Sequence, residues 1–354
     1  MGKKISVLGS GSWGTALSMV LAENGHHVSL WGRNEKQMSE MQATRENKRY
    51  LPGVLLDDTI ALTSSLQESI TDADYILVVV PTKAMRDVLS DINKLMTATS
   101  VFIHASKGIE PETHYRISQI IEEEISEEKR EGVVVLSGPS HAEEVCKKQP
   151  TTVTCSSIHM NIAEDVQDLF MNQAFRVYTN TDLIGVEIGG SLKNIIALGS
   201  GMTSGLGFGD NAKAALMTRG LAEIARLGVK LGANPLTFAG LSGLGDLIVT
   251  CTSQHSRNWR AGNMLGKGLS VEETEKELGM VVEGIRTTKA AYQLAKAVGV
   301  DMPITTELYE VLFNDKSVDE AVTRLMGRVK KREVEHLPLS SAFSHQDPLN
   351  HFEP

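Results

Sequence analysis

The sequence predicts an α/β fold, with an N-terminal doubly wound parallel sheet followed by an all-helical C-terminal domain. A strand, a glycine-rich turn and a helix open the chain, strand-like and helix-like segments then alternate, and helical periods with almost no strand signal fill Leu183 to Arg328. The chain has 354 residues, 41% of them hydrophobic, which suffices for two domains. We expect these domains over residues 1–181 and 182–335, and a disordered tail over residues 336–354.

The N-terminal element is a short β-branched run, Lys3 to Leu8, that reads as a buried strand. It leads into the turn GSGSWG, whose glycines have separate tasks before a helix opens at Thr15. Gly9 permits the tight turn, Gly11 lets a pyrophosphate approach the main chain, and Gly14 lets the helix pack on the strand. Free amides at the helix start can hold the anion. This context predicts a Rossmann-type dinucleotide site; the alternative is a glycine-rich turn without a ligand.

The second strand, His27 to Gly32, bears on the choice of cofactor. In NAD-preferring versions of this fold an acid lies about 20 residues beyond the glycines and binds the ribose hydroxyls. The matching place here is Trp31-Gly32-Arg33-Asn34, which contains no acid. Because Arg33 could pair with a 2′-phosphate, we expect NADPH to be favoured over NADH. The alternative is that Arg33 is a solvated loop cation.

The rest of the first domain continues the alternation of strands and helices. Helices are expected over Glu35 to Asn47 and Thr82 to Ile92, and the acidic run Glu122 to Glu131 suggests a solvated helix end. The further expected strands are Thr59 to Thr63, Asp74 to Val80, Ser100 to Ala105, Val133 to Leu136, Thr151 to Cys155 and Phe175 to Tyr178. Ligands of such sheets bind at the carboxyl ends of the strands, where Lys107 and the Gly138–Ser140 turn fall.

Composition excludes several classes of function. The net charge of −9 argues against a nucleic-acid partner, and no run of about 18 apolar residues predicts a membrane span. Three cysteines, Cys146, Cys155 and Cys251, have no metal-ligand spacing, and their odd number argues against a disulfide framework. No signal peptide precedes the first strand, so we expect a cytoplasmic protein. The sequence contains no cluster of metal ligands, so we expect no bound metal.

Two charged residues in apolar surroundings are candidates for chemistry in the helical half. Lys193, followed by Asn194, lies in a helix of apolar and small residues, and Asp246 lies in the stretch LSGLGDLIVT. A buried lysine and a buried acid each need a partner, so they are candidates for each other. The alternative is a structural ion pair that joins two helices.

A third stretch, Ser256-Arg257-Asn258, has the composition of an anion site. Arginine suits bidentate binding of phosphate, and a helix that opens here adds backbone amides. The alternative is an ordinary capped helix with surface cations.

Taken together, these motifs resemble bacterial NAD(P)-dependent glycerol-3-phosphate dehydrogenases. The resemblance rests on GSGSWGTAL, SKGIE, LSGPSHAEEV, KNIIALGSGMTSGLGFGDNAKAAL, GLGDLIVTCTSQHSRN and VVEG, in unchanged order from Gly9 to about Met302. It implies a Rossmann domain joined to a helical domain, a homodimer, and NADPH or NADH as cofactor. The implied reaction is the reversible reduction of dihydroxyacetone phosphate to sn-glycerol 3-phosphate, which supplies phospholipid synthesis.

The resemblance also assigns roles to residues. Lys193 would donate or accept the proton. Asp246 would hold the Lys193 side chain, and Lys107 would contact both cofactor and substrate. Further substrate contacts would be Gly138, Ser140, Ser256, Arg257 and Asn258. Besides the three glycines, the cofactor contacts would be Ser12, Trp13, Arg33, Ala142, Arg257, Val281 and Glu283.

Two rival functions remain at this point. A β-hydroxyacid dehydrogenase of the same architecture also uses a helix lysine, but its pattern resembles G-G-x-x-K-x-x-x-N. Here Asn194 follows Lys193 directly, and Ala197 occupies the place of that asparagine. A nucleotide-binding redox sensor would have little reason to keep Lys193, Asp246 and Arg257 together.

Overall fold

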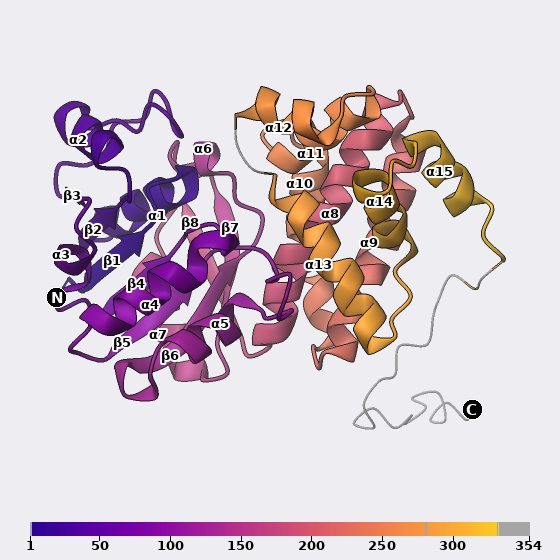
Figure 1. Cartoon of the computed structure of the whole chain (residues 1–354). Coiled ribbons are helices and arrows are strands. Elements are labelled where there is room, and N and C mark those ends of the chain that lie inside the picture. Colours follow the sequence, from indigo (N-terminus) through magenta and orange to yellow (C-terminus); the bar gives the residue numbers. More distant parts are fainter. Residues whose placement is uncertain (1, 280–281, 331, 333–354) are drawn as a thin grey trace, which may run out of the picture.

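The computed structural model describes residues 2–279, 282–330 and 332. The expected tail over residues 336–354 and the expected cofactor contact at Val281 lie outside the described residues. Figure 1 shows a sheet-containing part, built from the first half of the chain, beside a helical part built from the second half. The predicted fold class is confirmed.

The described residues of the first part form an eight-stranded sheet in the order β3-β2-β1-β4-β5-β6-β7-β8. The strands are β1 (Lys4–Leu8), β2 (His27–Trp31), β3 (Ala61–Thr63), β4 (Tyr75–Val78), β5 (Ser100–His104), β6 (Arg130–Ser137), β7 (Thr151–Ser156) and β8 (Phe175–Asn180). The prediction of a fully parallel sheet is wrong at one place, because β7 pairs antiparallel with β6. The connection, residues 138–150, holds a helix of only 4 residues, so the chain turns back instead of crossing over.

Helices cover both faces of this sheet, as a doubly wound fold requires. They are α1 (Ser12–Glu23), α2 (Glu35–Thr44), α3 (Leu66–Ile70), α4 (Met85–Leu95), α5 (Ile117–Glu124), α6 (Ala142–Val145) and α7 (Met160–Phe170). Successive strand residues point to opposite faces: Val7 packs with α1, α6 and α7, and its neighbour Leu8 packs with α3, α4 and α5.

Several details differ from the sequence prediction; among them, α1 begins at Ser12 and not at Thr15. The helix expected from Thr82 begins as a short 3-10 turn, and α4 proper starts at Met85. The acidic run ends in a strand, because β6 already starts at Arg130. Helix α7 was not predicted, since it starts without a capping side chain or an acidic first turn.

The second part is built around one buried helix, α8 (Leu183–Gly205), whose residues from Gly185 to Thr203 are all buried. The described residues from 182 to 330 contain no strand. The other helices are α9 (Asp210–Lys230), α10 (Asp246–Thr252), α11 (Arg257–Gly266), α12 (Val271–Leu278), α13 (Glu283–Val298), α14 (Pro303–Phe313) and α15 (Val318–Met326). None of the described helices is long and apolar enough to cross a membrane.

Helices α8 and α11 approach each other closely because glycine lies on both sides of the contact. A Cβ atom at Gly262 would lie 1.9 Å from the carbonyl oxygen of Leu198, and one at Gly201 would lie 2.0 Å from that of Trp259. This backbone contact fixes where α11 begins, and therefore where the side chains of its first turn lie.

Candidate active site

A cavity of about 150 Å³ lies where the carboxyl ends of the sheet strands meet the helical part. The loops after β5 and β6 supply one side, and α8, α10, α11 and α13 supply the other. The lining residues are Lys107, Ser140, His141, Lys193, Asn194, Asp246, Val249, Thr250, His255, Ser256, Arg257, Asn258 and Glu283. The cavity thus brings together the charged residues that the sequence singled out in both halves of the chain.

Asp246 is the centre of the cavity's charge arrangement. Its side chain is only 1% exposed and lies between two ammonium groups. Lys193 of α8 donates to Oδ1, and Lys107 of the β5 loop donates to Oδ2 at 3.0 Å. A carboxylate with two such donors is stabilised in its charged form although it is buried.

The backbone before Asp246 explains how the carboxylate reaches α8. Residues Leu241–Gly245 form a π-helical turn that leads directly into α10. A Cβ atom at Gly189 would lie 2.5 Å from the carbonyl oxygen of Ser242, so only glycine lets α8 approach this turn so closely. The glycine-rich stretches around Lys193 and Asp246 therefore position the ion pair.

Lys193 is 6% exposed, and its surroundings disfavour its charge. Burial lowers the pKa of Lys193 from its ordinary 10.5; the neighbouring Asp246 opposes this change, and the charge of Lys107 adds to it. Burial raises the pKa of Glu283, against the effect of Arg257 and Lys107. A basic group and an acidic group that both have shifted pKa values and lie in one cavity are typical of an active site.

The first turn of α11 forms a second polar wall of the cavity. Ser256 caps the helix by accepting from the backbone N–H of Trp259 at 3.2 Å. Asn258 is buried and accepts from the backbone N–H of Gly284 at 2.8 Å, which ties α13 to α11. Arg257 lines the cavity between them, so a guanidinium and the start of a helix, both suited to an anion, lie on the same wall.

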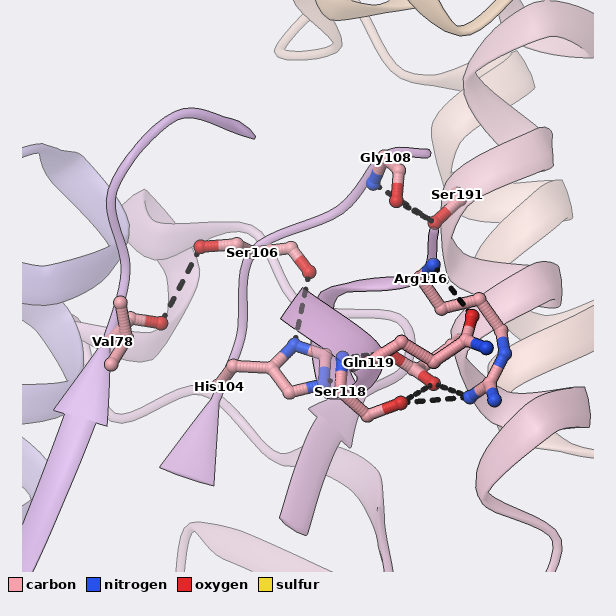
Figure 2. Close-up of polar contacts among 9 residues, drawn as sticks. Val78, His104, Ser106, Gly108, Arg116, Ser118, Gln119 and Ser191 are labelled. Atoms are coloured by element: carbon pink, nitrogen blue, oxygen red, sulfur yellow. Dashed lines mark hydrogen bonds and ion pairs between the residues drawn. The ribbon is translucent and has the colours of Figure 1, made fainter. Parts of the chain in front are cut away.

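A polar network anchors α8 to the sheet part beside the cavity (Figure 2). Ser191 donates to the carbonyl oxygen of Gly108 and accepts from its N–H at 2.9 Å. One turn earlier, the buried carboxylate of Glu187 accepts from the N–H of Ser118 at 2.8 Å and from the side chain of Arg116. Nε2 of His104 lies 3.2 Å from the same carboxylate. These contacts hold the loop that carries Lys107 against the helix that carries Lys193.

The glycine turn after β1 fits a dinucleotide pyrophosphate. Gly9 has a φ of +127°, and a Cβ there would lie 2.6 Å from the carbonyl oxygen of Val79. A Cβ at Gly14 would lie 1.9 Å from the carbonyl oxygen of Gly9. At Gly11, by contrast, no described atom lies within 4 Å of an added Cβ, so the space in front of α1 is open. Helix α1 has no side-chain cap and no acid in its first turn, which leaves its amides for an anion.

The other residues predicted to contact the cofactor or the substrate lie at the same edge of the sheet, and they differ in solvent exposure. Arg33 is exposed directly after β2, and among the described residues its side chain has no ion-pair partner. Ala142 is buried at the start of α6, and Gly138, with a φ of +147°, shapes the end of β6. Neither Ala142 nor Gly138 lines the cavity, whereas Ser140 does.

Sequence reasoning missed several lining residues, notably His141 and His255. Their position in the sequence could have identified them, because His141 directly follows Ser140 and His255 directly precedes Ser256, both predicted substrate contacts. The other missed residues, Asn194, Val249 and Thr250, lie one turn or less from Lys193 or Asp246 on their helices.

Comparison with known proteins identifies the family to which this site belongs. Residues 4–163 match the N-terminal model of NAD-dependent glycerol-3-phosphate dehydrogenase, and residues 182–323 match its C-terminal model. This chain belongs to that family. The predicted resemblance, dehydrogenase activity and NAD(P) cofactor are thereby confirmed, and the β-hydroxyacid dehydrogenase and redox-sensor alternatives are not supported.

Individual relatives agree with the family assignment. A glycerol-3-phosphate dehydrogenase [NAD(P)+] of Bacillus cytotoxicus is 65% identical over 95% of this chain and 98% of its own length. The crystal structure of a glycerol-3-phosphate dehydrogenase from Coxiella burnetii is 38% identical with a TM-score of 0.89, covering 92% of this chain and 99% of that one. The Plasmodium falciparum enzyme is 26% identical with a TM-score of 0.85, covering 93% and 97%.

The Glu187 anchor of this dehydrogenase yields a stability prediction. Replacing Glu187 by Gln leaves Arg116 and the dipoles around it without a buried anion, so we expect a loss of about 3 kcal/mol in the free energy of unfolding. Burial raises the pKa of Glu187, but its contacts with His104, Arg116 and Ser118 outweigh this and lower it from 4.5 to about 2. The contribution is therefore complete above pH 4.5 and is lost as the pH falls toward 2.

Urea unfolding of the wild type and the Glu187→Gln variant between pH 3 and 8 measures this difference, which should shrink below about pH 4.5. The control is Glu23→Gln, which removes a surface pair with Lys148 and should cost about 0–1 kcal/mol. Equal losses in the two variants would contradict the anchoring role.

Proposed function

We propose that the cavity between the sheet and α8 is where this enzyme reduces dihydroxyacetone phosphate reversibly to sn-glycerol 3-phosphate. The observation that carries the proposal is the buried Asp246 held between Lys193 and Lys107 at the carboxyl end of the sheet. In this proposal residues 1–181 form the cofactor domain and residues 182–335 the substrate domain. The family matches over residues 4–163 and 182–323 support this division.

Lys193 is the proposed proton donor in reduction. When bound, the reduced nicotinamide cofactor supplies the hydride. Negative charge then develops on the C2 oxygen of the substrate, and the Lys193 ammonium can both attract that charge and release a proton to it. Asp246 orients the ammonium, and in the oxidative direction the neutral amine takes the proton back.

The surroundings of Lys193 adjust it for this task. An ordinary lysine, with a pKa of about 10.4, releases its proton reluctantly at neutral pH. Burial, assisted by the charge of Lys107, lowers the pKa of Lys193, so proton release becomes easier. Lys107 retains its own contact with Asp246 and adds positive charge where the substrate oxygen would lie.

The phosphate of the substrate is assigned to the start of α11. Arg257, together with Ser256 and Asn258, would bind it, and Ser140 lies on the opposite wall. Gly138 would contribute by shaping the loop that carries Ser140. Binding energy at this end of the substrate orients the carbonyl toward Lys193.

The cofactor is assigned to the glycine turn and its neighbours. The amides of Ser12 and Trp13 follow the open space at Gly11 and would hold the pyrophosphate. Arg33 would pair with the 2′-phosphate, so NADPH is the favoured cofactor. Ala142 and Glu283 would complete the site toward the cavity, and Val281 stays a predicted cofactor contact.

Three further aspects are proposed from the family resemblance rather than from the site. We propose that the enzyme acts as a homodimer, that it works in the cytoplasm, and that it supplies glycerol 3-phosphate for phospholipid synthesis. The three cysteines are described as free thiols, which supports a reducing compartment.

The central mutation is Lys193→Met, which removes the ammonium but keeps an unbranched side chain of similar length. Asp246 keeps Lys107 as partner, so the fold and NADPH binding should persist. We expect kcat for dihydroxyacetone phosphate reduction to fall by about 10²–10⁴. In the wild type, kcat should also fall as the pH rises through the pKa of Lys193, which lies below 10.5. The pH–rate profile of the variant should lack this alkaline fall.

The matched control is Arg257→Ala, which should mainly raise KM for dihydroxyacetone phosphate, because it removes a phosphate contact and leaves the proton donor. Near-normal turnover of a folded Lys193→Met variant would exclude Lys193 as donor and direct attention to Lys107.

Cofactor choice is tested at Arg33. Arg33→Ala should raise KM for NADPH about tenfold and leave KM for NADH nearly unchanged, because only NADPH carries the 2′-phosphate. Arg176→Ala, at an exposed position on the opposite edge of the sheet, serves as control and should change neither constant. Equal effects of Arg33→Ala on both cofactors would place Arg33 on the shared adenosine instead.

A further inference from the structure

Two histidines that the proposed mechanism does not use face each other across the cavity. His141 follows the β6 loop in the sheet part, and His255 lies in the turn between α10 and α11 in the helical part. Their ring centroids are 5.7 Å apart, with an interplanar angle of 54°. Both line the cavity beside residues assigned to the substrate phosphate, Ser140 and Ser256.

His141 is not held in place by a hydrogen bond at its inner ring nitrogen. Its Nε2 is buried, and within the described part of the chain no partner lies within hydrogen-bonding geometry of it. A buried polar atom without a partner is costly, so it is expected where a ligand or a proton completes the site. His255 carries no such cost, because it is exposed at the outer side of the cavity.

The net charge of the cavity lining can be compared with the charge of a substrate phosphate. Among the described lining residues, the cations Lys107, Lys193 and Arg257 stand against the carboxylates Asp246 and Glu283. Counted as ionised, and with the histidines left out, these five groups carry one net positive charge. A phosphate monoester carries about −1.5 to −2 charges near neutral pH, so one further cation would match it.

We propose that His141 and His255 form a second wall of the substrate's phosphate site, and that His141 takes up a proton when the phosphate enters. The inference rests on the proposed function, since it places the phosphate at the start of α11. It adds two substrate-binding residues, one from each half of the chain.

The surrounding groups set the direction of the pH effect. Burial lowers the pKa of His141 below 6.5; Glu144 and Glu143 of α6 act to raise it, and Lys193 of α8 and the facing His255 act to lower it. The free His141 ring is therefore mostly neutral at pH 7, and an entering dianion raises its affinity for a proton. Binding coupled to proton uptake weakens as the pH rises, so the benefit of the histidines should be greatest at low pH.

The test uses the full-length enzyme and the variants His141→Gln, His255→Gln and their combination. We expect KM for dihydroxyacetone phosphate to rise about tenfold in the double variant at pH 6.5, and the gap from wild type to narrow by pH 8.5. The inhibition constant of inorganic phosphate, competing with dihydroxyacetone phosphate, should rise in parallel. KM for NADPH should stay unchanged, and this result would show that the variants are folded. His159→Gln, at an exposed position, is the matched control.

A second measurement follows the proton directly. Dihydroxyacetone phosphate is titrated into enzyme saturated with NADP⁺, where no hydride is available, by calorimetry in buffers of different ionisation enthalpy. The wild type should take up more protons than the double variant at pH 7.5. Equal proton uptake, or a raised KM with an unchanged phosphate inhibition constant, would overturn the proposal. A wild-type enzyme that does not turn over dihydroxyacetone phosphate would instead refute the proposed function itself.

Discussion

The structure depends on one buried carboxylate that neither half of the chain can satisfy alone. Asp246 receives Lys193 from its own helical part and Lys107 from the loop after β5. Removing both cations would leave a buried charge without a partner, which costs several kcal/mol. The ion triad therefore links the two parts of the molecule at the point where the chemistry is proposed. It also explains why two lysines can lie close together, since their mutual repulsion is opposed by the shared anion.

Helix α8 extends this link away from the cavity. Glu187 and Ser191 are four residues apart and so lie on one side of the helix, where both contact the sheet part. Lys193 follows half a turn later and faces the cavity. One buried helix thus carries both the anchor and the proposed proton donor, so a displacement at the Glu187 network would be transmitted to Lys193. Such preorganisation limits the reorganisation needed when charge develops on the substrate.

Much of this arrangement was predictable from sequence because the signals were local. The glycine turn and its flanking strand and helix predict a dinucleotide site within the first fourteen residues, and a lysine and an aspartate in apolar stretches suggest each other as partners. The reversal between β6 and β7 was not predictable, since it follows from a short connection that also reads as a crossover. The Glu187 anchor and the His141–His255 contact each join residues more than 60 positions apart, and no spacing rule reports such pairs.

The central claim is that Asp246 controls the protonation of the Lys193 ammonium, and the most direct test is the pH dependence of kcat in Asp246→Asn. Asparagine keeps the shape of the side chain but removes the charge that opposes burial and Lys107. The pKa of Lys193 should then fall further, and the alkaline limb of kcat for dihydroxyacetone phosphate reduction should move to lower pH by about one unit or more. An alkaline limb at the wild-type position, in a variant that still binds NADPH, would contradict the account.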